Sequence, residues 1–520
     1  MQILTEIMIG LTALGVAWPM LHIFQLEGYV IRQNISWIKK NTARFFSWEY
    51  FALIGAAVLY FVIQLSNAAV WMISAIVLSA ALAGAVLISA AKKTLGKDVK
   101  KKLAFTKRMQ RLIAMTAFVW AVMLVLAMLE TVLIPLLAII APFLPMIAGW
   151  IMQPVERGIN QRFFNDAKSR LEKREDLIKI GITGSYGKTS TKFILAAILS
   201  QKYNVLASPS SFNTPMGLTR VIREQLTQAH QVFIAEMGAR HVGDIDELCD
   251  LVAPKYGLIT SVGKQHLETF FSLQNIINTK YELIAALPED GTAFFADDGG
   301  IVRGMWERTD IEKVLSGFAD DCFITARDIS VGERGCDFTL GLGEESIQVS
   351  TKLLGRHNIS NILLCCAVAI KLGISLQQIK AALAKLEPVE HRLQLIKGAG
   401  GLTIIDDAFN SNPAGAKAAL EVISQFSGRR VIITPGMVEL GDEETELNRK
   451  FGRQMAKSVD TAVLLGRKRC APIRQGLLEE GFPEESIIMA ESLNEAMAQI
   501  HKYAGAGDVL LFENDLPDNY

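Results

Sequence analysis

The sequence lacks the features of a secreted disulfide-rich domain or a nucleic-acid-binding domain. It has six cysteines in 520 residues and no C-x-x-C pair, so we expect reduced thiols rather than a disulfide framework or a zinc site. Neither charge sign is in excess, with 53 Lys and Arg against 53 Asp and Glu, which excludes a basic nucleic-acid-binding domain. No internal repeat or low-complexity segment is apparent, and the composition disfavours a fibre or a disordered chain.

Apolar residues, by contrast, make up half of the chain, and the mean hydropathy is +0.28. Charge is unevenly distributed along the sequence. Residues 1–152 hold 13 Lys and Arg but 5 Asp and Glu, whereas the remainder holds 40 and 48. This asymmetry predicts a basic membrane anchor followed by an acidic soluble enzyme.

The first 152 residues contain five apolar runs, most of them near the roughly 20 residues that a helix needs to cross a bilayer. They are Ile7–Phe24, Phe51–Leu65, Val70–Ala91, Leu112–Leu129 and Val132–Met152. The second is short and is also compatible with a re-entrant segment, and a buried helical bundle is the alternative for the whole region. No positive segment precedes the first run, so we do not interpret it as a signal peptide.

The charges between these runs predict an orientation. Lys and Arg gather after the first and third runs, whereas the connections after the second and fourth carry no basic residue. The positive-inside rule then places the N-terminus outside and everything after Met152 in the cytosol, as in a multi-pass protein of the cytoplasmic membrane. No acidic, His or Arg residue lies mid-run, so we expect an anchor or lipid-handling platform rather than a pump.

Residues 153–177 are polar and helix-prone, and we expect a juxtamembrane linker helix there. Beyond it, short β-branched runs alternate with helical patterns, which predicts an α/β fold with a buried parallel sheet. The expected strands are Ile178–Thr183, Val232–Glu236, Gly257–Ser261, Thr403–Asp406, Val431–Thr434 and Ala462–Leu465.

The first of these strands runs directly into a glycine-rich turn and then an apolar helix. The turn contains Gly184, Ser185, Tyr186, Gly187, Lys188, Thr189 and Ser190. A turn of this kind directs backbone N–H groups at phosphate, where Lys188 would neutralise charge and the Thr189 hydroxyl would hold magnesium. The strict G-x-x-x-x-G-K-[ST] spacing is not met, because position 182 is Ile. A chance glycine turn is the alternative, but strand, turn and helix together predict nucleotide binding.

This loop and the motifs after it resemble the Mur ligase family, ATP-dependent amino-acid ligases of peptidoglycan synthesis, and most closely its D-alanyl-D-alanine-adding branch. The matching motifs, within about residues 178–515, are Glu236–Ala239, Thr260–Glu268, Lys280–Glu282, Gly355–Asn361, Glu390–Arg392, Asp406–Pro413 and Gly436–Gly441. The resemblance implies a central ATP-binding domain over residues 178–388 and a Rossmann-like C-terminal domain over residues 389–520.

The resemblance also implies residue roles. ATP would be bound by the loop from Gly184 to Ser190, by Asn358 and Asn361 at adenine, by Arg392 and by Asp407 at the ribose. Magnesium would be bound by Thr189, Glu236, His266 and carbamylated Lys280. Lys188, His266, Lys280 and Arg392 would be the catalytic residues. Each of these assignments has a structural alternative. Lys280 could be an ordinary surface lysine, and Glu236 a solvated acid at the end of a strand. The two asparagines could be helix N-caps.

Three features depart from the family pattern. No UDP-binding domain precedes the glycine-rich loop, a Lys-Gly-Ser near the C-terminus is absent, and an asparagine near Phe294–Asp298 is missing.

We therefore predict an acyl-phosphate ligase, in which a muramyl-peptide-like carboxylate attacks ATP and the amine of an amino acid or dipeptide captures the product. The expected partners include membrane lipid and no nucleic acid. One alternative is the same chemistry on a lipid-linked or polymeric carboxylate at the inner leaflet. Others are a transporter or membrane regulator with a borrowed ATPase domain, and a non-catalytic scaffold.

Overall fold

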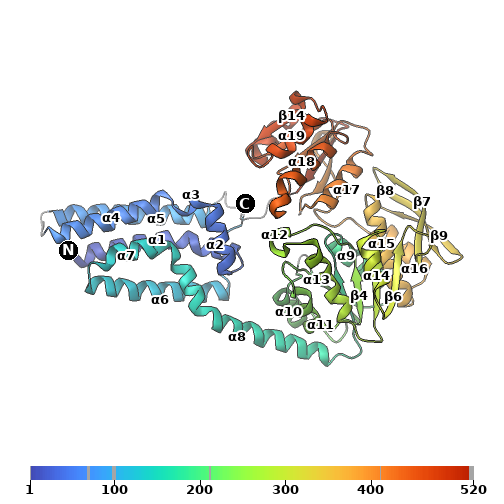
Figure 1. Cartoon of the computed structure of the whole chain (residues 1–520), viewed down its shortest axis with the longest axis horizontal. Helices are drawn as coiled ribbons and strands as arrows, with labels where there is room; N and C mark the ends of the chain where they lie inside the picture. Colours follow the sequence, from blue (N-terminus) through green and yellow to red (C-terminus); the bar gives the residue numbers. More distant parts are fainter. Residues whose placement is uncertain (1, 67–70, 97–100, 210–211, 410, 515–520) are drawn as a thin grey trace. The chain divides into compact units, whose positions relative to one another are not determined.

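The computed structural model describes residues 2–66, 71–96, 101–209, 212–409 and 411–514. Its internal contacts divide the chain into an N-terminal unit that extends to Gln161 and a second unit from Arg162 onward. The first unit is helical and the second contains two sheets flanked by helices (Figure 1). The predicted fold class, apolar helices followed by α/β domains, is confirmed.

Among its described residues, the N-terminal unit has five segments that are long and apolar enough to cross a membrane, judged by length and composition. They are α1 (Gln2–Leu26), α4 (Trp48–Leu65), α5 (Met72–Leu95), α6 (Lys107–Leu129) and the composite Leu133–Glu172. Two short helices, α2 (Ile31–Lys40) and α3 (Thr42–Phe45), lie between α1 and α4. These segments match the five predicted apolar runs, although Val70, the first residue of the third run, lies outside the described residues.

The fifth apolar run differs from the expectation, because it is not one helix. Helix α7 (Leu133–Ile140) is followed by a 3₁₀ turn, η2 (Ala141–Phe143), before α8 (Leu144–Glu172) begins. Pro142 lies in this turn and lacks the N–H that a continuous α-helix requires. α8 runs through residue 152 without a break, so the linker helix expected over residues 153–177 is the second part of α8 and ends at Glu172.

Small residues on α1 let its neighbours approach closely. Ala13 and Ala17 are fully buried, and a Cβ added to Gly15 would lie 2.9 Å from Val86 Cγ1 of α5. Lipid tails are as apolar as the helices themselves, so close packing of this kind is what holds membrane helices together.

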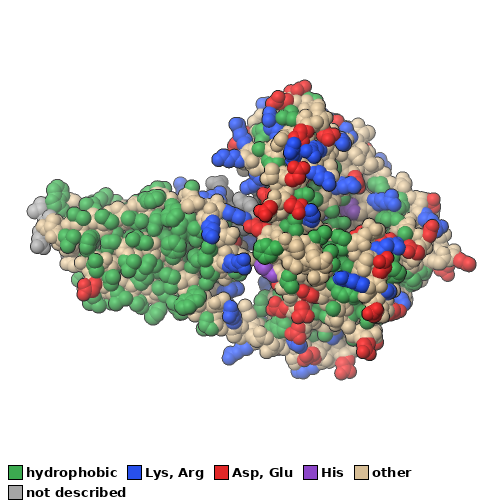
Figure 2. Space-filling model, viewed as in Figure 1, with side chains coloured by type: hydrophobic (Ala, Val, Ile, Leu, Met, Phe, Trp, Pro, Cys, Tyr) green, Lys and Arg blue, Asp and Glu red, His purple; other side chains and the backbone are tan. Residues whose placement is uncertain are grey.

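The outward faces of the same unit are apolar. Hydrophobic side chains cover most of the helical part in Figure 2. Exposed examples are Leu59, Val62, Ile73, Val77, Leu78, Ile88, Phe118, Val125 and Leu126. Soluble monomers rarely expose so much contiguous apolar surface, and this favours a membrane domain over a soluble bundle.

The second unit begins with a nine-stranded sheet in the order β2-β3-β1-β4-β5-β6-β7-β8-β9. The strands are β1 (Ile178–Thr183), β2 (Val205–Ala207), β3 (Val232–Glu236), β4 (Tyr256–Ile259), β5 (Thr292–Ala296), β6 (Glu312–Gly317), β7 (Ile324–Gly332), β8 (Gly335–Leu342) and β9 (Glu345–Thr351). The seven strands from β2 to β7 in this order, which include β1, are parallel. β7, β8 and β9 form an antiparallel extension. The carboxyl ends of the parallel strands therefore meet along one edge, where open α/β sheets bind ligands.

Two apolar cores cover the two faces of this sheet. The first packs α9 (Lys188–Leu199), α15 (Arg356–Lys371) and α16 (Leu376–Ala384) on one face. The second packs α10 (Pro215–Glu224), α11 (Asp244–Val252), α13 (Leu273–Ala285) and α14 (Ile301–Glu307) on the other, together with the end of α8. The short helix α12 (Leu267–Phe270) precedes α13.

The last domain contains a six-stranded sheet in the order β10-β11-β15-β12-β13-β14. The strands are β10 (Gln394–Lys397), β11 (Thr403–Asp407), β12 (Arg430–Thr434), β13 (Thr461–Leu465), β14 (Ile487–Ala490) and β15 (Val509–Glu513). All pairs are parallel except β10 with β11. Its helices are α17 (Pro413–Ile423), α18 (Glu444–Met455), α19 (Ala471–Glu479) and α20 (Leu493–Ala498).

All six predicted strands exist, and β1 and β3 have the predicted bounds. The prediction Gly257–Ser261 was wrong at its end, because β4 stops at Ile259. The Thr260 N–H still donates to the Thr183 carbonyl of β1, and the hydroxyls of Thr260 and Ser261 hold the glycine-rich turn.

Candidate active site

The glycine-rich turn between β1 and α9 is held from beneath by the segment after β4. The Thr260 hydroxyl donates to the Tyr186 carbonyl at 2.6 Å, and the Tyr186 N–H donates to Ser261 Oγ at 2.9 Å. A Cβ on Gly184 would lie 2.1 Å from Thr260 Oγ1, so this position has room for glycine alone. These contacts fix the turn at the N-terminus of α9. The backbone N–H groups at a helix N-terminus have no partner within the helix and favour the binding of phosphate.

Lys188 is the first residue of α9 and folds back over the turn. Its ammonium group donates to the Gly184 carbonyl at 2.7 Å and to the Ser185 carbonyl at 3.3 Å. Burial lowers the pKa of Lys188 to about 8, against the opposing charge of Glu236. A cation that rests on its own loop carbonyls can move onto phosphate at little structural cost, and the predicted contact of Lys188 with phosphate stays a prediction.

Glu236 ends β3 beside the turn and is 1% exposed. Its Oε1 accepts hydrogen bonds from the Thr189 hydroxyl and from the Asn213 amide, both at 3.1 Å. Its Oε2 accepts from Lys192 Nζ at 2.9 Å. Burial alone would raise the pKa of Glu236, but the charges of Lys192 and Lys188 outweigh it and lower that pKa below the usual value. The carboxylate is therefore ionised.

The Thr189–Glu236 pair fits magnesium. Hydroxyl and carboxylate oxygens are the hard donors that Mg²⁺ prefers, and Mg²⁺ characteristically takes few protein ligands and completes its shell with water and phosphate oxygens. Among the residues that the structure describes, no group of three or more His, Cys, Asp or Glu side chains forms a closed metal cage. An open site of this kind suits an ion that arrives with a nucleotide.

His266 lies after β4, at the start of α12, with a left-handed φ of 52°. Its Nδ1 lies 2.5 Å from Oε2 of Glu439, which belongs to the last domain. Burial lowers the pKa of His266, although the hydrogen bond to Glu439 opposes the shift. A neutral imidazole is the form that binds metal.

A cavity of about 600 Å³ joins these groups. Its lining includes the predicted residues Ser185, Tyr186, Gly187, Lys188, Thr189, Ser190, Glu236, His266 and Arg392. Asn213, Arg240, His241, Asp244 and Asn412 also line it and were not predicted. The cavity thus brings a phosphate-binding turn, a carboxylate, an imidazole and an arginine to one place.

The other predicted residues are not among those that line this cavity. Asn361 packs beneath the turn, because a Cβ on Gly187 would lie 2.7 Å from its Oδ1. The Asn358 amide donates to the Leu354 carbonyl at 2.9 Å, and the Asn361 amide donates to Asn358 Oδ1. Both asparagines are buried. Their predicted contact with adenine stays a prediction.

Lys280 lies on α13 and is 3% exposed, so it is not the surface lysine of the alternative interpretation. Burial, together with the positive charge of Lys188, lowers the pKa of Lys280 to about 7. A neutral amine is the form that reacts with CO₂ to give a carbamate. The predicted modification therefore has a chemical basis, although it stays a prediction.

Arg392 and Asp407 lie where the last domain begins. The Arg392 guanidinium lies over the ring of Phe409, 4.2 Å from its centroid. The Leu393 N–H donates to Asp407 Oδ1 at 3.2 Å. Burial raises the pKa of Asp407 to about 6 although Arg392 opposes the shift. Asn410, in the same motif, lies outside the described residues.

The structure also shows functional candidates that the sequence reasoning missed. Lys192 is fully buried against Glu236. Its position one helical turn after Lys188 is the sequence feature that could have indicated that it lies beside the same site. Glu513 ends β15 and accepts hydrogen bonds from the Ser411 and Thr434 hydroxyls. It lies in the segment where the Lys-Gly-Ser of the family is absent.

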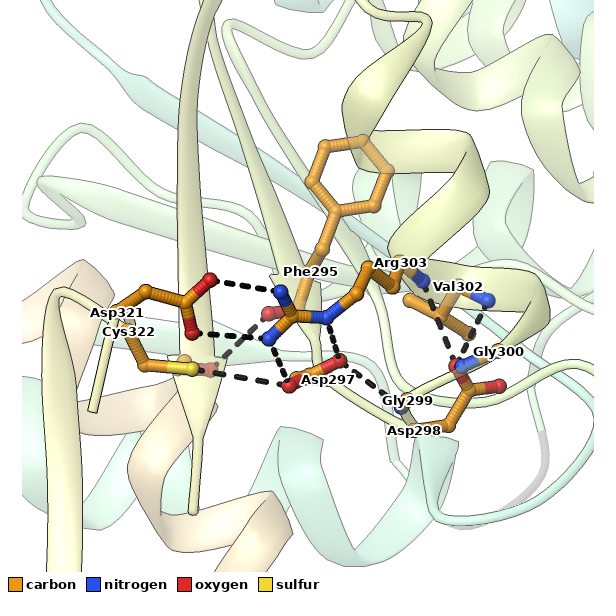
Figure 3. A network of polar contacts seen from close by, with 10 residues as sticks. Phe295, Asp297, Asp298, Gly299, Gly300, Val302, Arg303, Asp321 and Cys322 are labelled. Carbon is orange, nitrogen blue, oxygen red and sulfur yellow. Dashed lines mark hydrogen bonds and ion pairs between the residues drawn. The ribbon is translucent and has the colours of Figure 1, made fainter. Parts of the chain in front are cut away.

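A separate polar network follows β5, where the family asparagine is missing. Figure 3 shows Arg303 between the carboxylates of Asp297 and Asp321. Asp297 also accepts from the Gly299 N–H at 2.9 Å, and Asp298 Oδ1 accepts from the Val302 N–H in the first turn of α14 at 3.0 Å. These contacts fix the loop after β5, so we interpret the network as structural.

The sheet edge, turn and cavity define a P-loop nucleotide-binding enzyme. Two families match: the Mur ligase middle domain over residues 182–369 and the Mur ligase glutamate ligase domain over residues 391–513. The chain belongs to the Mur ligase family, as the sequence motifs predicted. Members of this family are ATP-dependent acid–amino-acid ligases that use Mg²⁺.

Curated relatives are named UDP-N-acetylmuramoyl-tripeptide--D-alanyl-D-alanine ligase. The Escherichia coli protein is 32% identical over 313 residues, which are 60% of this chain and 69% of that one. The Mycobacterium tuberculosis protein is 33% identical over 315 residues, 58% of this chain and 61% of that one. The chain therefore spans between three fifths and seven tenths of these relatives.

Solved structures agree on the fold. MurF from Acinetobacter baumannii has a TM-score of 0.61 at 26% identity and covers 68% of this chain and 77% of its own. MurF from Thermotoga maritima, in complex with ADP, has a TM-score of 0.62 at 23% identity, with 68% and 80% covered.

Proposed function

We propose that this chain joins the carboxylate of a muramyl-peptide-like acceptor to the amine of an amino acid or dipeptide, with ATP converted to ADP and phosphate. The observation that carries the proposal is the cavity in which Lys188, Glu236, His266 and Arg392 meet. The names of the relatives supply the substrate class.

The side chains of the cavity support an acyl-phosphate route. Lys188 and Arg392 carry the positive charge that a transferring γ-phosphoryl group needs. Bound Mg²⁺, held by Thr189 and Glu236 and also by His266 and carbamylated Lys280, would neutralise further negative charge. The acceptor carboxylate attacks the γ-phosphate, ADP leaves, and the amine then displaces phosphate from the acyl phosphate to form the amide.

The position of the acceptor is a second part of the proposal. Five apolar segments among the described residues precede the ligase domains, and they present hydrophobic side chains outward. We propose that they anchor the chain in the cytoplasmic membrane with the catalytic domains in the cytosol, as the basic connections predict. A lipid-linked or polymeric carboxylate at the inner leaflet is then the favoured alternative to a UDP-linked acceptor.

One assay separates these possibilities. The full chain in lipid nanodiscs is given ATP, D-alanyl-D-alanine or single amino acids, and either UDP-linked or lipid-linked muramyl peptide. We expect ADP, phosphate and amide in equal amounts from one of the acceptors, and far less from Lys188→Ala. AMP as product would overturn the acyl-phosphate route. ATP turnover without amide for any acceptor would favour the transporter or regulator alternative.

A further inference from the structure

The contact between His266 and Glu439 is one of several contacts between the central domain and the last domain. Helix α12 (Leu267–Phe270) of the central domain contacts the 3₁₀ turn η4 (Gly441–Glu443) of the last domain. Lys264 Nζ lies 2.6 Å from Glu443 Oε2, and a Cβ on Gly441 would lie 3.6 Å from the Glu268 nitrogen. Glu439 therefore lies in the middle of a built interface between the ATP-binding and C-terminal domains.

The backbone at Glu439 has an unusual conformation. Its φ is 64°, in the left-handed region that non-glycine residues rarely adopt, and His266 opposite has a φ of 52°. The two side chains are 21% and 16% exposed. Two such conformations in facing residues are maintained only where surrounding contacts determine them, and they occur preferentially at functional sites.

The carboxylate of Glu439 determines which nitrogen of His266 is free. His266 Nδ1 lies 2.5 Å from Glu439 Oε2, and an ionised carboxylate only accepts hydrogen bonds, so with Glu439 ionised Nδ1 is the nitrogen that donates. Nε2 then keeps its lone pair on a ring that lines the cavity together with Lys188 and Glu236. A histidine held by a carboxylate on one nitrogen and free on the other is the usual arrangement of metal-binding imidazoles.

We propose that Glu439 is a positioning residue for the nucleotide-bound metal: it fixes the tautomer and orientation of His266 from the last domain. The inference rests on the proposed function, because it takes His266 as a metal ligand. It adds that the central domain completes its metal site only when the last domain is docked. The metal site is then assembled when the last domain closes onto the central domain.

Arg240 offers a competing role for Glu439. Arg240 Nη2 lies 3.6 Å from Glu439 Oε1, and Arg240 lines the cavity. In that role, the Glu439 carboxylate would bind Arg240 at the position where the carboxylate of the acceptor substrate would otherwise bind. Simple packing of the two domains is another possibility. The three roles predict different results for the same variants.

The test measures Mn²⁺ affinity by electron paramagnetic resonance on the full chain in detergent, with ADP present. Glu439→Ala should weaken Mn²⁺ binding by about 10–100-fold. Glu439→Gln keeps the shape of the side chain and should give a smaller loss. Glu443→Gln is the matched control, because it breaks an ion pair in the same interface without touching His266, and its affinity should equal that of the wild type.

A double-variant cycle identifies the route of the effect. In a His266→Ala background, Glu439→Ala should cause no further loss, since Glu439 acts on the metal only through the His266 ring. Additive losses, an equal loss in Glu443→Gln, or unchanged Mn²⁺ affinity in Glu439→Ala would each overturn the proposal. Tighter acceptor binding with unchanged Mn²⁺ affinity would assign Glu439 to Arg240 instead. A wild-type chain that binds ADP and Mn²⁺ but forms no amide would overturn the proposed function and leave the role of Glu439 to be judged by the same affinities.

Discussion

Lys192 Nζ lies 2.9 Å from Glu236 Oε2, and the two side chains are 0% and 2% exposed. The ammonium group comes from α9 and the carboxylate from the end of β3. The pair therefore fixes the orientation of the predicted magnesium ligand from the same helix that carries Lys188.

Removal of Lys192 should leave a buried carboxylate without its counter-ion. We expect Lys192→Met to destabilise the central domain by about 3–5 kcal/mol, the usual cost of breaking a buried pair on one side. Hydrogen exchange of the amides in β1 and β3 measures this in the full chain. The double variant Lys192→Met with Glu236→Gln should recover most of the loss. Equal instability of the single and double variants would contradict the ion-pair explanation.

Lys188→Ala should lower activity strongly while the fold persists. The ammonium group donates to carbonyls of its own turn, so its loss costs little stability, but the γ-phosphoryl group loses a cation. We expect ATP turnover to fall by about 100-fold or more. Lys202→Ala is the control, because that ammonium also donates to backbone carbonyls but follows the far end of α9. Normal turnover in Lys188→Ala would remove the basis of the enzymatic proposal.

Gly187→Ala and Gly243→Ala separate crowding from backbone strain. Both glycines cap a helix with left-handed φ, 81° and 88°, so each alanine costs about 1–2 kcal/mol in the backbone. At Gly187 the new Cβ would also meet Asn361 Oδ1 at 2.7 Å, whereas Gly243 has nothing within 4 Å. We expect ADP affinity to fall by about tenfold or more in Gly187→Ala and to be unchanged in Gly243→Ala. Equal affinities would show that the packing of Asn361 does not shape the turn.

Carbamylation of Lys280 should depend on pH and bicarbonate. Burial lowers the pKa of this lysine to about 7, so the reactive neutral amine becomes the main form as the pH rises through that value. Activity should therefore rise from pH 6 to pH 8 and respond to added bicarbonate. A carbamate signal in ¹³C NMR with labelled bicarbonate should be present in the wild type and absent in Lys280→Arg. A bicarbonate response that persists in Lys280→Arg would assign the effect to another group.

Glu513 should make the last domain less stable at high pH. Burial raises its pKa from 4.5 to about 8, so the folded domain holds a proton there that the unfolded chain releases above about pH 4.5. The stability contributed by this proton is complete below pH 4.5 and is lost as the pH rises towards 8. Hydrogen exchange of amides in β12 and β15 should show this slope, and Glu513→Gln should flatten it. An unchanged slope in Glu513→Gln would place the titrating group elsewhere.

Local patterns in the sequence were sufficient for six of the parallel strands and for the phosphate-binding turn, but not for the antiparallel extension of β7, β8 and β9. Buried strands such as Ile178–Thr183 consist of continuous apolar runs, and a glycine-rich turn after a strand has few other structural uses. Residues that leave a strand to serve another segment cannot be recognised this way. Thr260 and Ser261 continue the sequence pattern of β4, but their hydroxyls bond to Tyr186 in the turn, and the pattern does not record where the strand ends.

By itself the sequence determined the apolar helices, the α/β layering, the family motifs and the lysine, carboxylate and histidine of the cavity. Each of these depends on neighbours in the chain or on a short motif. The tertiary structure alone decided that Lys192 neutralises Glu236 and that Glu439 reaches His266 from 173 residues away. Such pairs arise from the packing of strands and domains, and no local periodicity records which buried charge will meet which partner.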